Sequence, residues 1–79
     1  MSTRKVVAVS LTALVARINR KLRKQGEKLR RAYTESAQQE VGHYFVVDLN
    51  RNRIVNTDVD PEQFARELEV LQPWEALES

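Results

Sequence analysis

The 79-residue sequence has no cysteine and little glycine, proline or histidine. Without cysteine there is no disulfide framework, thiolate metal site or cysteine nucleophile, and a reducing compartment is allowed. Two glycines and two prolines leave little room for long irregular loops. No apolar run reaches the roughly 18 residues that a membrane span requires. We therefore expect no membrane partner and a cytoplasmic location.

The composition that remains is that of one small globular domain. Hydrophobic residues make up 42% of the chain and charged residues 30%, which is typical of a folded protein. The net charge of +2 hides a strong asymmetry along the sequence. Residues 1–32 hold ten Lys/Arg and one acidic residue, a net charge of +9, whereas residues 33–79 hold three Arg and ten acidic residues, a net charge of −7. This segregation indicates a binding surface rather than a nearly neutral one.

The first half predicts a long amphipathic helix over residues 10–39, after a lead-in over residues 1–9. Ser10 is suited to cap its N-terminus, and Val6–Val9 forms either a short strand or the first helical turn. Gly26 lies at the edge of the apolar stripe, so the helix bends or breaks there, or another element packs closely against it. The stripe, at three- and four-residue steps, is Leu11, Leu14, Val15, Ile18, Leu22, Leu29, Ala32 and Tyr33.

The second half opens with a predicted β-hairpin over residues 43–58. The segment HYFVVDL is rich in aromatic and β-branched residues, and Asn50-Arg51-Asn52 supplies turn residues before a returning strand. Alternation places Phe45 on one face and Tyr44 on the other. Aromatic residues beside arginines either stack on nucleic-acid bases or fill the core.

A shorter helix is predicted over residues 60–72, followed by a C-terminal turn over residues 73–79. Asp60 is a suitable N-cap, and Pro61 suits the first helical position. The predicted fold is therefore a single α+β domain of order α-β-β-α, with the long helix packed across the hairpin and the second helix. That long helix would span roughly 40 Å. Its stripe exceeds what the following residues can cover, so we expect a homodimer.

The candidate binding site is basic. Eight cations lie on the helix face opposite the stripe, and two lie at the hairpin tip. Such a face binds nucleic-acid phosphates or an acidic protein surface, and a partner would offset the repulsion between like charges one turn apart. Plain solvation and an anionic membrane surface are alternatives. The candidate residues are Arg17, Arg20, Lys21, Arg23, Lys24, Lys28, Arg30, Arg31, Arg51 and Arg53.

No arrangement of residues predicts catalysis, a cofactor or a metal site. His43 is the only histidine, and no Ser or acidic residue stands at a spacing that suggests a triad. The acidic run from Asp58 to Glu62 resembles a calcium loop, but Gln63 stands where such loops require glycine. Helix capping explains these acids instead. We therefore expect a protein that is not an enzyme.

Three segments, residues 10–32, 42–55 and 59–77, resemble a group of small, largely uncharacterised proteins carried on bacterial plasmids and integrative mobile elements. The resemblance implies a context in which small proteins bind DNA or obstruct host defence proteins, as anti-CRISPR proteins of this size do. It carries over no functional residues. The first hypothesis is a nucleic-acid-binding accessory protein, and the alternative is a protein-binding inhibitor or adaptor.

Overall fold

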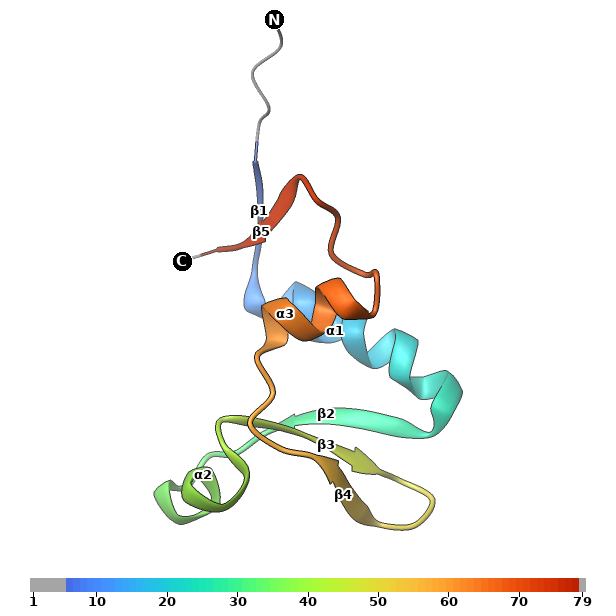
Figure 1. Cartoon of the computed structure of the whole chain (residues 1–79), viewed down its shortest axis with the longest axis vertical. Coiled ribbons are helices and arrows are strands. Elements are labelled where there is room, and N and C mark those ends of the chain that lie inside the picture. The colour runs from blue at the N-terminus through green and yellow to red at the C-terminus, as the bar shows by residue number, and fades with distance from the viewer. Residues whose placement is uncertain (1–5, 79) are drawn as a thin grey trace, which may run out of the picture.

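The computed structural model describes residues 6–78 and shows a mixed α+β domain, which confirms the predicted fold class. Two helices, α1 and α3, lie between a three-stranded sheet and a two-stranded ribbon (Figure 1). Residues 1–5 of the predicted lead-in and Ser79 lie outside the described residues. In chain order the elements are β1 (Val7–Val9), α1 (Leu11–Leu22), the 3-10 helix η1 (Arg23–Gln25), β2 (Glu27–Arg31), α2 (Glu35–Val41), β3 (Tyr44–Asp48), β4 (Arg53–Asn56), α3 (Pro61–Glu67) and β5 (Glu75–Leu77).

The first helix starts where the sequence predicts. The backbone of Ser10 is extended, and its Oγ accepts a hydrogen bond from the N–H of Ala13 at 3.2 Å. Leu14, Ile18 and Leu22 project from one side of α1 and are fully buried, as an amphipathic helix requires. Within residues 6–78, no helix combines the length and apolarity needed to cross a bilayer.

The predicted helix over residues 10–39 is wrong beyond Gln25. Gly26 follows η1 with a φ of 71°, a left-handed conformation that ends the helix and reverses the chain. A Cβ on Gly26 would lie 2.5 Å from Nδ2 of Asn50 in the β3–β4 turn. Gly26 therefore both breaks the helix and allows close approach of another element.

The segment that follows Gly26 is a strand, although Glu, Lys, Leu and Arg favour helix locally. Pairing overrides that preference, because β2 runs antiparallel to β3 with Leu29 opposite Val46. Both side chains are buried in the core. The last part of the predicted helix is instead the separate helix α2, which Thr34 caps by accepting from the N–H of Ala37.

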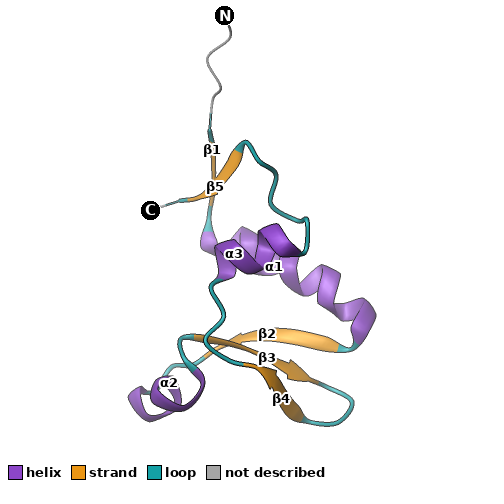
Figure 2. Cartoon of the chain, in the orientation of Figure 1, coloured by secondary structure: helices purple, strands orange, loops and turns teal. Residues whose placement is uncertain are grey.

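The hairpin predicted over residues 43–58 is confirmed as β3 and β4 (Figure 2). β3 pairs antiparallel with β4, with Val47 opposite Ile54, and one bulge interrupts the register. Side chains alternate across the sheet, so buried Val46 faces the core and Val47 faces away from it. We call the surface away from the core the outer face. By register its members are Lys28, Arg30, Phe45, Val47 and Ile54.

The exposed edge of β2 is capped by a side chain from α1. Oδ1 of Asn19 accepts a hydrogen bond from the N–H of Leu29 at 2.7 Å, and Nδ2 donates to the Leu29 carbonyl at 3.4 Å. One carboxamide thus takes the place of a neighbouring strand. This contact fixes α1 against the sheet.

The second predicted helix starts at its expected cap but ends early. Oδ1 of Asp60 accepts from the N–H of Glu62 at 3.1 Å, and Pro61 occupies the first turn. The predicted end at residue 72 is wrong, since Glu69 has a φ of 62° and the N–H of Val70 bonds to the Ala65 carbonyl. This is a Schellman closure with Glu where Gly is usual, so the sequence carries no stop signal there.

Of the C-terminal turn predicted over residues 73–79, Pro73 and Trp74 do form a turn, but Glu75–Leu77 are strand β5, which pairs in parallel with β1. Two α3 side chains cap its other edge. Nη2 of Arg66 donates to the Glu75 carbonyl at 2.8 Å, and Oε2 of Glu62 accepts from the N–H of Leu77 at 2.9 Å. The strand alternative for Val6–Val9 is therefore the one observed, because β1 provides the partner for β5.

Most of the apolar stripe is buried within the chain, but Tyr33 at its predicted end is 82% exposed. Leu14, Ile18 and Leu22 of α1 pack with Leu29 of β2 in one cluster, which also includes Val9, Val46, Ala65 and Leu71. The homodimer was predicted because the stripe of a continuous helix would be too long for the chain to cover. In this fold the chain itself covers the part of the stripe on α1, so that argument no longer applies, and the homodimer stays a prediction.

Gly26→Ala is expected to lower the free energy of unfolding by about 1–3 kcal/mol, because a Cβ is strained at this φ and meets Asn50. Urea denaturation followed by circular dichroism measures the change. Adding Asn50→Ala removes the close contact but not the strained φ, so it should restore only part of the loss. Wild-type stability of Gly26→Ala would contradict the proposed role of the reversal.

Asn19→Ala is expected to cost about 1–3 kcal/mol in the same assay, because it leaves the Leu29 N–H and carbonyl without their partner. Thr12→Ala, at an exposed position of the same helix, is the control and should change stability by less than about 0.5 kcal/mol. Equal effects of the two substitutions would show that the edge contact contributes nothing.

Candidate functional site

Arg17 is engaged inside the fold. Its Nη1 and Nη2 donate to the two carboxylate oxygens of Glu75 at 2.8 and 3.0 Å, and Nη1 also donates to the Val70 carbonyl at 3.1 Å. Glu75 is only 9% exposed. A bidentate pair of this kind is geometrically specific and joins α1 to β5. We therefore assign Arg17 a structural role and leave it out of the proposed binding surface.

The ion pair shifts the titration of both partners. The Arg17 hydrogen bonds lower the pKa of Glu75, and a hydrogen bond from the N–H of Gln72 lowers it further, while burial opposes both. The Glu75 hydrogen bond in turn raises the pKa of Arg17. The carboxylate is thus held in its charged form as a structural group.

The other nine predicted binding residues are exposed, and within residues 6–78 none forms an ion pair with an acidic residue. They lie on consecutive elements rather than on one helix face. The last turn of α1 carries Arg20 and Lys21, η1 carries Arg23 and Lys24, β2 carries Lys28, Arg30 and Arg31, the β3–β4 turn carries Arg51, and β4 begins with Arg53.

The fold brings the hairpin cations to the end where η1 turns into β2. The N–H of Leu49 donates to the Gly26 carbonyl at 2.8 Å, which joins the hairpin turn to the glycine reversal. Figure 1 shows η1 and the β3–β4 turn at the same end of the domain, with α2 at the opposite end of the sheet. We call this the basic end; its members are Arg23, Lys24, Lys28, Arg51 and Arg53.

A shallow groove of about 260 Å³ runs along α1 beside the basic end. Arg20, Lys21 and Lys24 line it together with Arg17, and Val70 forms the apolar part of the lining. Among the residues that the structure describes, no carboxylate belongs to this lining. The groove is suited to an anionic group, and Val70 is a member that no sequence pattern points to.

A second groove, of about 300 Å³, lies on the outer face of the sheet. Phe45, Val47 and Ile54 form its floor with Leu49, and its other lining residues are Arg30, Asn52 and Arg53. The two aromatic residues of the predicted hairpin lie on opposite faces of the sheet, because Tyr44 packs against the core whereas Phe45 faces this groove.

Ile54 and Asn52 line the groove but were not among the predicted site residues. The alternation of side chains along β4 is the sequence pattern that could have indicated Ile54.

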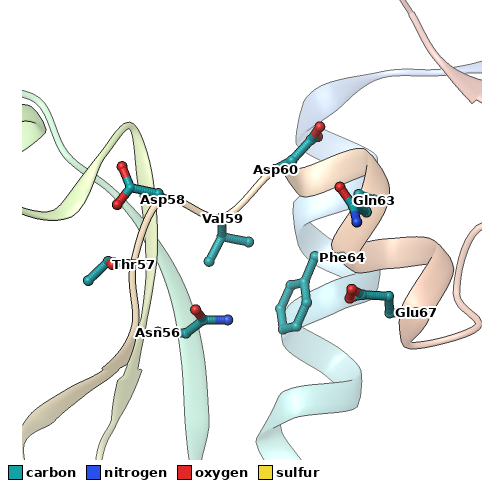
Figure 3. A pocket seen from close by; sticks show the side chains of 8 residues that line it. All are labelled: Asn56, Thr57, Asp58, Val59, Asp60, Gln63, Phe64 and Glu67. Carbon is teal, nitrogen blue, oxygen red and sulfur yellow. The ribbon is translucent and has the colours of Figure 1, made fainter.

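The acidic half of the chain forms a different pocket, at the start of α3 (Figure 3). Asp58, Asp60 and Glu67 line it with Val59 and Phe64. Asp60 caps α3, as described above, and Oδ1 of Asp58 would lie 2.5 Å from a Cβ placed on Gly42. Within residues 6–78 no three His, Cys, Asp or Glu side chains are grouped to hold a metal ion. His43 is exposed.

The chain matches no protein-family model, and comparison with the curated proteins and with the solved structures finds no match either. The assignment of function therefore depends on the geometry of the chain itself.

The lowered pKa of Glu75 predicts an acid-sensitive contribution to stability. A carboxylate with a depressed folded pKa contributes fully above its ordinary pKa of 4.5, and the contribution is lost as the pH falls through the folded value. Glu75→Gln should therefore be less stable than wild type near neutral pH and should lose less stability on acidification below about pH 4. Urea midpoints measured across this range test it.

The matched control for this prediction is Glu40→Gln, at an exposed position of α2. It should keep the wild-type dependence of the urea midpoint on pH. A Glu75→Gln profile that overlays the wild-type profile at every pH would show that the Arg17–Glu75 pair does not stabilise the fold.

Proposed function

We propose that the protein binds nucleic acid through its basic surface, without enzymatic activity. One observation carries the proposal: nine exposed Lys and Arg side chains between Arg20 and Arg53 have no acidic partner within residues 6–78. Neutralising phosphates with such side chains releases condensed counterions, which favours binding. A nucleic-acid partner is also compatible with a cytoplasmic location.

The contacts are proposed to be mainly to the phosphate backbone. α1 is held by the fold on its apolar side, and its cations lie in its last turn and in η1 rather than along a free recognition helix. Long, flexible Lys and Arg side chains on several elements contact phosphates readily but carry little sequence information. We therefore propose binding of low sequence specificity.

A protein partner is the second candidate, as expected of an inhibitor or adaptor from a mobile element, including an anti-CRISPR-like one. Exposed apolar side chains beside the cations favour it, since Leu49 is 51% and Ile54 is 45% exposed. Such a partner would present an acidic patch with an apolar centre. A homodimer remains compatible with either candidate.

Neutralising three cations is expected to weaken nucleic-acid binding and its salt dependence. Lys21→Gln, Lys24→Gln and Lys28→Gln together should lower affinity for a duplex of about 20 base pairs at least tenfold at low salt. The slope of log K against log [salt] should fall by about 2–3, because each phosphate contact contributes about 0.9. Fluorescence anisotropy at several salt concentrations measures both quantities.

The matched control lowers the net charge by the same amount at other positions. Gln39→Glu, Gln63→Glu and Gln72→Glu change the net charge equally, at exposed positions outside the basic surface. This variant should lose much less affinity than the lysine variant. Equal losses would show a net-charge effect without a defined surface, and absence of wild-type binding to DNA or RNA at low salt would reject the proposed function.

A further inference from the structure

The outer face of the sheet is an open surface with an unusual combination of residues. Phe45, Val47 and Ile54 form an apolar floor, and Arg30 and Arg53 line the same groove. Lys28 belongs to the same face, because it pairs with Val47 across β2 and β3. Within residues 6–78, no carboxylate lines this groove. Its occupant must therefore present both negative charge and flat apolar groups.

Charge complementarity selects among the possible occupants. Two copies of this chain meeting face to face would bring Arg30 and Arg53 of both copies into one interface. Among residues 6–78, no carboxylate in the groove lining is present to offset their repulsion. A duplex presents its phosphates outward and keeps its base faces stacked inside, so it cannot use the apolar floor. A single strand presents phosphates and unstacked bases together.

The register places one guanidinium group directly beside the aromatic ring. Arg30 and Phe45 are direct partners across β2 and β3. Arg53 opens β4, at the edge of the same groove. By register Arg53 lies opposite Asp48 and not beside Phe45. The groove therefore has one guanidinium group next to the aromatic ring and a second elsewhere in its lining, an arrangement suited to base stacking together with phosphate contacts. The basic end continues this charge beyond the groove through Arg51 in the turn.

We propose that a single-stranded nucleic acid lies across the outer face of the sheet, with a base stacked on Phe45 and phosphates on Arg30 and Arg53. This inference rests on the proposed function and adds a preference for single strands over duplex. Phosphate contacts alone would leave the apolar floor of the groove without a role.

The test is fluorescence anisotropy with a labelled single strand of about 12 nucleotides, as DNA and as RNA, and with the corresponding DNA duplex. Wild type should bind at least one single strand more tightly than the duplex. Phe45→Leu should weaken single-strand binding by about tenfold, the effect of losing one stacked base, and should change duplex binding less than twofold. Phe45→Tyr keeps an aromatic ring and should retain most of the affinity.

The matched control is Trp74→Leu, because Trp74 is an exposed aromatic residue next to β5, away from this face, and is 54% exposed. It should leave both affinities unchanged. Circular dichroism melting of each variant separates lost contacts from lost folding. If Phe45→Leu unfolds, Arg30→Gln replaces it and should weaken single-strand binding more than duplex binding.

Several outcomes separate this inference from the proposed function. Equal binding of single strand and duplex, unaffected by Phe45→Leu, would overturn the inference and leave backbone binding intact. Polyglutamate competing as well as an unlabelled single strand would overturn it too, because charge alone would then explain binding. A dimer that Phe45→Leu dissociates would place a second copy on this face. No binding of any oligonucleotide would reject both proposals.

Discussion

The left-handed conformation of Gly26 reverses the chain between α1 and β2, and the hairpin turn fits beside it because glycine has no Cβ. Because of this reversal, β2 runs back beneath α1, and Leu29 packs in the same core as Leu22. It also positions the hairpin through the bond from Leu49 to the Gly26 carbonyl. Cations that are some 25 residues apart in sequence therefore gather at one end of the domain.

A hydrophobic core this small provides limited stability. Polar side chains from the helices add to it by forming hydrogen bonds with the edges of the strands. Asn19 caps the edge of β2, while Glu62 and Arg66 cap the edge of β5. Arg17 connects α1 to the side chain of Glu75 in the same strand. These contacts satisfy backbone groups that would otherwise lack partners. Two of them are ion pairs, Arg17 with Glu75 and Arg66 with Glu62. The Lys and Arg residues between residues 20 and 53 take no part in these pairs and remain on the surface.

Local signals predicted part of this fold, and tertiary contacts decided the rest. Ser10 and Asp60 cap their helices as their side chains predict, and the alternation within residues 43–58 predicts the hairpin. The segment after Gly26 was beyond local reasoning, because its helix-forming residues become a strand only when β3 supplies a partner. The preceding Arg-Lys-Gln and Gly26 are nonetheless a standard helix end, and they were the available signal for the break. Glu69 in a left-handed conformation had no such signal.

The candidate site was predictable in composition but not in shape. The sequence identifies the cations. The predicted continuous helix would have placed eight of them on one helix face, whereas the structure distributes them over α1, η1 and β2. It also withdraws Arg17 into an ion pair, which depends on Glu75 at the far end of the chain. The outer face depends on pairing three strands, so Phe45 becomes the cross-strand partner of Arg30, and Ile54 comes to line the same groove, only in the folded sheet.

The exposure of apolar residues in the groove on the outer face is informative because a domain of this size has few apolar side chains with which to stabilise its core. Burying Ile54 and Leu49 would contribute about 1.5–3 kcal/mol for each side chain, a large fraction of the stability of a domain this size. The fold instead leaves both about half exposed beside unpaired cations. A ligand that binds only the folded state returns stability in proportion to its concentration and affinity. If the proposed ligand binds this face, the residues that the fold leaves unburied would couple the stability of the domain to ligand binding.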